Sequence, residues 1–125
     1  MYKIAKIGEN AFYLKAVGTF PPSVSKEFVK EFREKTKKLP KFSVIVDGLD
    51  LIMLNLKSFK IVLRLLKKNN KRLERSAYII SKNPVLNKEA QIMFEKANSP
   101  KRKVVGSFDE AKEWIGISEI VIEKE

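Results

Sequence analysis

The spacing of hydrophobic and polar residues predicts two strands and a helix at the start of the chain. Residues 2–7 and 11–20 alternate in the manner of half-buried strands, and a Gly-Glu-Asn turn sequence lies between them. We therefore expect an antiparallel hairpin. A Pro-Pro pair then breaks the second strand and opens a helix that Ser23 or Ser25 would cap. The inward residues of this helix recur at helical spacing: Val24, Phe28, Phe32 and Leu39.

The pattern between residues 42 and 70 predicts a strand, an apolar connection and a second helix. Residues 42–47 form a β-branched run typical of a buried strand, and the turn-forming pair Asp47-Gly48 would close it. Residues 49–56 are then a loop-like connection that is unusually apolar. We expect the next helix over residues 58–70. Its inward stripe consists of Phe59, Val62, Leu63 and Leu66.

The last part of the chain predicts strands and helices in alternation. Residues 76–81 are a strand, residues 83–98 a helix that begins at an Asn-Pro pair, and residues 103–105 a short strand. Residues 107–116 give the best-specified helix, because it opens with a Ser-Phe-Asp-Glu capping box and closes with a glycine. Residues 117–123 are either an edge strand or a tail.

The resulting order is β-β-α-β-α-β-α-β-α, with or without a final strand. Alternating strands and helices with short connections predict an α/β fold with about four helices, in which the later strands are parallel and joined by right-handed crossovers. A chain of 125 residues corresponds to a single domain, residues 1–125.

Composition excludes several kinds of chemistry. The chain has neither cysteine nor histidine, so it lacks thiolate nucleophiles, disulfides and the commonest general base and metal ligand. We therefore expect a protein that is not an enzyme and has no cofactor. No apolar run approaches the roughly 20 residues of a membrane span, and the N-terminus lacks the apolar core of a secretory signal. A cytoplasmic location is the expectation.

The chain is strongly basic, with 26 Lys and Arg residues, 15 Asp and Glu residues and a formal net charge of +11. Such a surface attracts nucleic acid, anionic lipid or an acidic protein, although the charge can also serve solubility alone. The helix expected over residues 58–70 carries a basic stripe along one face. Two hypotheses remain open for it, an anion-binding surface or an ordinary solvated face. Its residues are Lys60, Arg64, Lys67, Lys68, Lys71 and Arg72.

Two local segments resemble a known family. Val44-Ile45-Val46-Asp47 precedes an apolar link and a helix that includes residues 59–63, and residues 104–115 form a short strand followed by a helix with Ala111 and Trp114. In this order they are similar to the STAS fold of bacterial anti-anti-sigma factors and the SpoIIAA-like group. The resemblance implies a mixed sheet and a regulatory module that binds a protein partner.

The chain departs from that family at the phosphoserine motif. The family has roughly Asp-Ser-Ser-Gly before the helix, whereas this chain has Asn55-Leu56-Lys57-Ser58. The resemblance therefore implies a STAS-like binding module that is degenerate at the phosphoserine motif. Ser58 is either the cap of the helix or a phosphosite, because a phosphate is stabilised at a helix N-terminus. The predicted partner-binding residues are Leu51, Met53, Asn55, Leu56 and Ser58.

Three further alternatives stay open. The apolar residues 49–56 belong either to the core or to a surface for a partner or a second copy of the chain. Asp47 and Asp50 follow a predicted central strand, where two carboxylates can hold Mg²⁺ or simply form a turn. A SEC14-related branch resembles the same layout, which would imply a small-ligand or lipid-binding module and requires a hydrophobic pocket.

Overall fold

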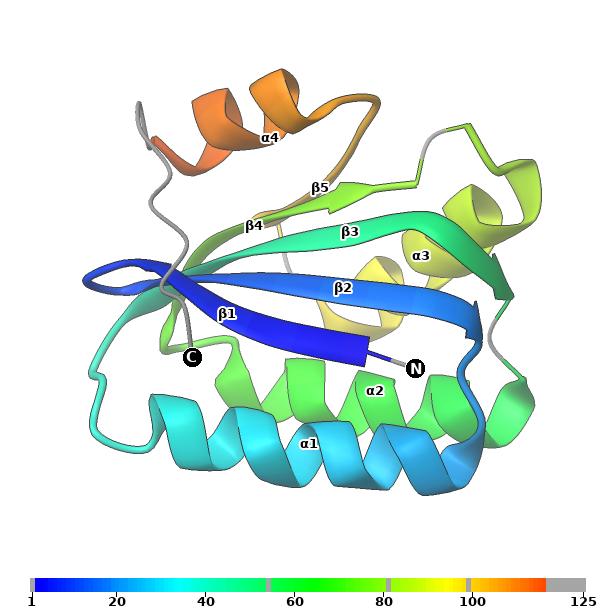
Figure 1. Cartoon of the computed structure of the whole chain (residues 1–125), viewed down its shortest axis with the longest axis horizontal. Helices are drawn as coiled ribbons and strands as arrows, with labels where there is room; N and C mark the ends of the chain where they lie inside the picture. Colours follow the sequence, from blue (N-terminus) through cyan, green and yellow to red (C-terminus); the bar gives the residue numbers. More distant parts are fainter. Residues whose placement is uncertain (1, 54, 81, 99, 117–125) are drawn as a thin grey trace.

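The fold is a five-stranded mixed sheet with four helices, described in a computed structural model over residues 2–53, 55–80, 82–98 and 100–116 (Figure 1). The strands are β1 (Tyr2–Gly8), β2 (Ala11–Thr19), β3 (Phe42–Met53), β4 (Leu73–Ile79) and β5 (Arg102–Val105). The helices are α1 (Pro22–Thr36), α2 (Leu56–Asn69), α3 (Pro84–Ala97) and α4 (Phe108–Ile115). The expected edge strand or tail over residues 117–123 lies outside the described residues.

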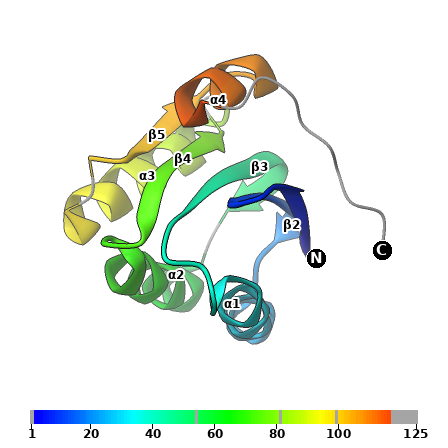
Figure 2. The same cartoon turned by 90° about the vertical axis from the view of Figure 1, so that its left-hand side faces the viewer.

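The strands lie in the sheet in chain order. β1 and β2 form the expected antiparallel hairpin, and each later strand pairs in parallel with the one before it. Helices α1, α2 and α3 cover one face of the sheet, and α4 packs on the other (Figures 1 and 2). Alternation along β2 fits these layers, since Phe12 and Leu14 pack toward α1 while Ala11 and Tyr13 pack toward α4. The expected α/β class is confirmed.

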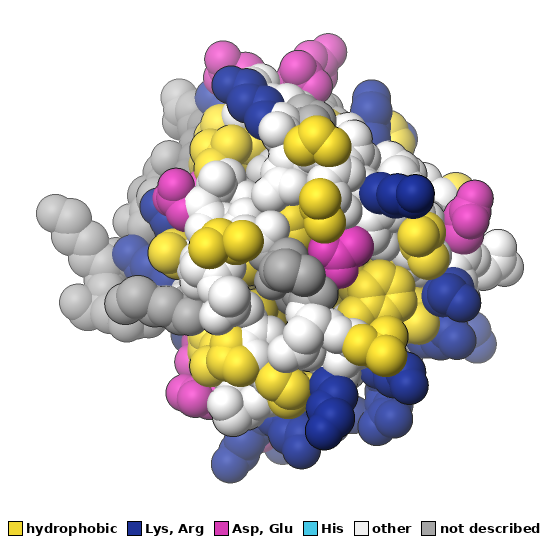
Figure 3. Space-filling view, turned by 90° about the vertical axis from the view of Figure 1, so that its right-hand side faces the viewer, with side chains coloured by type: hydrophobic (Ala, Val, Ile, Leu, Met, Phe, Trp, Pro, Cys, Tyr) yellow, Lys and Arg dark blue, Asp and Glu magenta, His cyan; other side chains and the backbone are white. Residues whose placement is uncertain are grey.

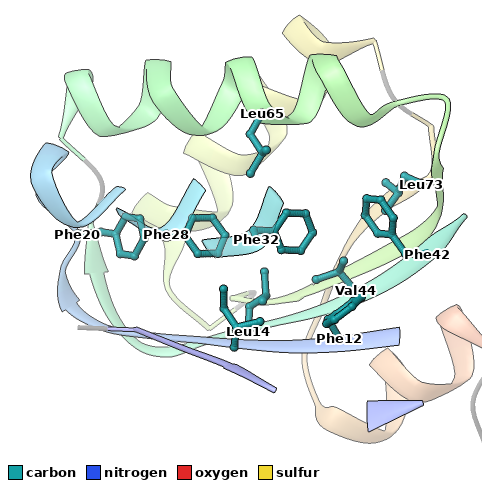
Figure 4. Packing of buried hydrophobic residues seen from close by; sticks show 10 residues of the cluster. Phe12, Leu14, Phe20, Phe28, Phe32, Phe42, Val44, Leu65 and Leu73 are labelled. Carbon is teal, nitrogen blue, oxygen red and sulfur yellow. The ribbon is translucent and has the colours of Figure 1, made fainter. Parts of the chain in front are cut away.

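The core between the sheet and the first two helices is rich in phenylalanine. Rings from α1, β2 and β3 meet edge to face at centroid distances of 5.5–6.2 Å, as between Phe32 and Phe42 or Phe12 and Phe32 (Figure 4). Such pairs contribute about 0.5–1.5 kcal/mol beyond the area that they bury. Phe28 and Phe32 are both buried, as their helical spacing predicted.

Helix ends agree with the sequence pattern at some positions and not at others. Ser107 caps α4 by accepting the Glu110 N–H at 3.2 Å, and Gly116 closes that helix in a left-handed conformation with φ 79°. Helix α1 has no side-chain cap, because its cap position is Pro21, which has no side-chain acceptor, and both Ser23 and Ser25 lie inside the helix. The predicted cap at Ser23 or Ser25 is therefore wrong.

The main error of the sequence pattern concerns β3. Asp47-Gly48 does not form a turn, and residues 49–53 are not a loop, since β3 continues for 12 residues to Met53 and pairs with β2 as far as its end. Gly48 is needed there for close approach to β4. A Cβ at this position would lie 2.4 Å from Cγ2 of Ile80, which is too near for two carbon atoms.

Helix α2 also begins earlier than expected. It starts at Leu56, and Asn55 is its cap, because the Asn55 side chain accepts the Ser58 N–H at 2.9 Å. The interpretation of Ser58 as the cap is therefore wrong. Asn is among the best capping residues, and its place three residues before Ser58 gives it the first free N–H groups of the helix.

Candidate functional site

Exposed hydrophobic side chains gather where β3 ends and the next helices begin. Of the five large hydrophobic residues that are exposed in the described part of the chain, two lie in the second half of β3 and two in the first turns of α2 and α3, which begin at this end of the molecule (Figure 1). We call these four residues the apolar patch. Its members, with their exposed fractions, are Leu49 (57%), Ile52 (60%), Leu56 (69%) and Val85 (58%). Figure 3 views this end: hydrophobic side chains lie in several groups across the face with an acidic side chain among them, and Lys and Arg side chains lie mainly along its lower and right edges.

Asn83 connects the two segments that carry the patch. Its side-chain amide donates to the carbonyl oxygens of Leu51 at 3.4 Å and Ile52 at 3.2 Å, at the end of β3. Its side-chain oxygen accepts the N–H groups of Val85 and Leu86 at 3.1 Å and so caps α3. One amide therefore fixes the start of α3 against the end of β3, and Val85 is held beside the strand that presents Ile52.

The five predicted partner-binding residues divide between the surface and the interior. Asn55 and Leu56 are exposed, whereas Leu51 is half-buried and packs against the core. Ser58 is fully buried, and the side chain of Met53 lies outside the described part of the structure. The sequence pattern included Ile52 in the apolar segment 49–56, which was left open between core and partner surface, but it missed Val85, because no local signal shows which segment lies beside the start of α3.

Burial also contradicts the interpretation of Ser58 as a phosphosite. The side chain is 0% exposed, and its hydroxyl donates a hydrogen bond to the carbonyl oxygen of Phe20. A phosphate there would have no room and no contact with solvent in this conformation. The contact instead joins the start of α2 to the end of β2, so Ser58 positions the segment before α1.

The basic stripe is exposed along most of its length. The side chains of Lys60, Arg64, Lys67, Lys68 and Lys71 are on the surface, and none of them forms an ion pair with another described residue. Arg72 differs, because its guanidinium donates to the carbonyl oxygens of Thr36 and Leu39 and lies 5.2 Å from the centre of the Phe42 ring. Arg72 therefore holds the end of α1 and is not a free anion-binding group.

The two aspartates expected to form a turn or a Mg²⁺ site have other partners. Asp47 is buried, accepts hydrogen bonds from the Tyr13 hydroxyl and the Leu49 N–H, and faces α4. Burial, followed by the hydrogen bond to Asp47 and the charges of Asp47 and Asp50, raises the pKa of Tyr13 above its ordinary value. Asp50 pairs with Lys15 at 3.6 Å. Among the described residues, no three acidic groups come together in a way that could hold a metal ion.

No helix in the described ranges is long and apolar enough to cross a bilayer. No protein-family model and no curated protein sequence matches the chain.

Solved structures resemble it over most of its length. An uncharacterized protein of the DUF3478 family from Shewanella loihica PV-4 matches 90% of this chain and 92% of its own, with 18% identity and a TM-score of 0.72. The anti-sigma factor antagonist SpoIIAA in its unphosphorylated form matches 88% of this chain and 92% of its own, with 11% identity and a TM-score of 0.61. The expectation from the two local segments is confirmed at the level of architecture: this chain has the SpoIIAA-like fold.

Proposed function

We propose that the chain is a non-enzymatic regulatory module that binds a protein partner through the apolar patch. The observation that carries the proposal is the concentration of exposed hydrophobic side chains at one end of the sheet. Single exposed apolar residues are normal on a monomer, but a group of them bordered by charged residues is typical of an interaction surface. The likeness to an anti-sigma factor antagonist supports regulation as the general role.

The residues around the patch indicate the chemistry of the partner. Lys57 follows Leu56 directly, Lys60 lies one helical turn further on, and Lys82 precedes the start of α3; all three are exposed. We therefore expect a protein segment with apolar side chains at its centre and acidic side chains around them. Because the buried centre would be apolar, the complex should tolerate salt, and salt should act mainly on the association rate.

A pair of matched variants tests the proposal. Ile52→Asp places a charge in the apolar patch, and Ile92→Asp places the same charge on α3 at the fifth exposed hydrophobic residue, which lies outside the patch. Both positions are exposed, so each change should alter the free energy of unfolding by no more than about 0.5 kcal/mol. Proteins that the wild type retains would be purified, and their affinities for the wild type and for both variants would be measured by calorimetry at low and high salt.

The expected result is a partner whose affinity falls at least tenfold with Ile52→Asp, about 1.4 kcal/mol or more, and stays unchanged with Ile92→Asp. Equal binding by all three proteins would show that the patch is not the contact surface. An equal loss of affinity in both variants would show that binding responds to the added negative charge wherever it lies, and not to the apolar patch.

The basic stripe supports a second candidate function, binding to nucleic acid or another anionic surface. Four of its five exposed side chains lie on α2 and the fifth, that of Lys71, lies just after it. None has a carboxylate partner among the described residues, so their charge is free to attract phosphate groups. Binding of this kind would weaken steeply with salt, unlike binding through the apolar patch.

A further inference from the structure

A cavity of about 140 Å³, partly open to the surface, lies between the sheet and helices α1, α2 and α3. Apolar side chains from both the sheet and the helices form most of its wall. In Figure 4 the labelled side chains other than Phe12 all belong to this wall, and they surround the space from α1, α2 and the strands. Cores of native proteins are close-packed, and voids larger than a water molecule are few. A space of this size therefore requires an explanation.

The size of the cavity defines the size of a guest. An apolar cavity of about 150 Å³ lined by Leu, Ile and Phe side chains stays dry and takes up benzene or xenon. By that measure the cavity accommodates a molecule of about six to eight non-hydrogen atoms. Its apolar wall disfavours a charged guest, because a buried charge without partners is strongly destabilised.

One polar group in the wall lacks a partner. Ser76 lies on β4, beside Val44 of β3 and Arg102 of β5, and only 2% of it is exposed. Its hydroxyl forms no hydrogen bond with another described residue, although its backbone N–H and C=O are both bonded. Buried hydroxyls almost always have a partner. A guest with one hydroxyl or carbonyl group would supply the missing hydrogen bond.

The charged residues of the wall are consistent with a neutral guest. Four charged residues line the cavity: Lys3, Lys15, Glu89 of α3 and Arg102 of β5. The Arg102 guanidinium donates to the Leu66 carbonyl at 3.1 Å, so it is already engaged with the protein. Lys3 is exposed to solvent and Lys15 pairs with Asp50 at 3.6 Å, so these charges do not call for an ionised ligand either.

We propose that this cavity is a binding site for a small, neutral and largely apolar molecule whose single hydroxyl or carbonyl group hydrogen-bonds to Ser76. The site is separate from the apolar patch, so it adds a ligand to the proposed regulatory module and does not depend on the identity of the protein partner. A ligand that fills the cavity would also stabilise the packing of α1, α2 and α3 on the sheet.

Phenol and toluene are suitable probes, because they have nearly the same shape and differ by a hydroxyl in place of a methyl group. We expect both to raise the Tm of the wild-type protein and to bind with measurable heat in calorimetry. Ser76→Ala should weaken phenol about threefold to tenfold and leave toluene within about twofold. The variant should fold normally, since the hydroxyl that it removes has no partner within the described ranges.

Two further variants locate the binding. Ala90→Leu fills the cavity from α3 and should abolish binding of both probes; Ala16→Leu makes the same test from the sheet if the first variant does not fold. Ile52→Asp changes the apolar patch and should leave both affinities unchanged.

The proposal would be overturned if neither phenol nor toluene bound the folded wild-type protein. It would also be overturned if either probe still bound a folded variant in which the cavity is filled. An equal loss of phenol and toluene in Ser76→Ala would overturn the role of the hydroxyl.

Discussion

The close approach of Gly48 to Ile80 predicts a specific energetic coupling. The backbone of Gly48 does not have a positive φ, so alanine is compatible with its conformation. The obstacle is the Cγ2 methyl group of the buried Ile80, 2.4 Å from the position of a new Cβ; the next atoms are 3.7 and 3.8 Å away, at ordinary contact distance. The methyl group must move by about 1 Å to reach that distance, in a core where a forced insertion costs about 1–3 kcal/mol.

An alanine also restricts the unfolded chain, which stabilises a compatible site by about 0.4–1 kcal/mol. We therefore expect Gly48→Ala to lower the free energy of unfolding by up to about 2.5 kcal/mol, the difference between the two effects. Ile80→Ala removes the obstructing methyl group and by itself costs about 2–5 kcal/mol. In that background Gly48→Ala should become neutral or stabilising, because only the entropic effect remains.

Urea denaturation followed by the fluorescence of the single tryptophan, Trp114, measures all four free energies of this cycle. We expect a coupling energy of about 1–3 kcal/mol between the two positions. If Gly48→Ala cost the same with and without the methyl group, to within about 0.5 kcal/mol, steric contact with Ile80 would not be the reason for glycine at this position.

Three other expectations follow from the site and the basic stripe. Tyr13→Phe removes a hydrogen bond to the buried Asp47 carboxylate and should lower the free energy of unfolding by about 1–3 kcal/mol in urea titrations; no change would mean that water replaces it. Because the fold raises the pKa of Tyr13 above 10, its contribution to stability is complete below pH 10 and is lost as pH rises further, so the wild-type advantage over Tyr13→Phe should shrink above pH 10. Anisotropy titrations with labelled DNA and RNA test the basic stripe. A variant in which three of its cations are replaced by glutamate should bind all nucleic-acid sequences more weakly, by about the same factor. If this variant bound as tightly as the wild type, nucleic-acid binding through the stripe would be refuted. The variant carries Arg64→Glu, Lys67→Glu and Lys71→Glu.

The sequence pattern predicted the order of helices and strands well because local signals determine them. The capping box at Ser107 and the helical spacing of Phe28 and Phe32 depend on neighbours within one or two turns. The extent of β3 depends instead on β2 and on Ile80, which lie far away in sequence. An Asp-Gly pair favours a turn only when no neighbouring strand offers its backbone groups a partner.

The candidate site was harder to predict for the same reason. Residues 49–56 were recognised as unusually apolar, yet their division between core and surface follows from the alternation of a strand that the pattern took for a loop. The buried state of Ser58 depends on the carbonyl group of Phe20, 38 residues away. Val85 joins the patch only through Asn83, whose bonds to the end of β3 no local signal could indicate.

The order of the strands has a consequence for synthesis on the ribosome. Because β1 to β5 lie in the sheet in the order in which they are made, every new strand meets a partner that has already emerged. The hairpin of β1 and β2 needs only local contacts and forms within microseconds, far faster than the chain is extended at about 5–20 residues per second. Each following helix and strand can then be added to an existing edge, so no strand has to be inserted between two others and the sheet can grow in one direction as the chain is translated.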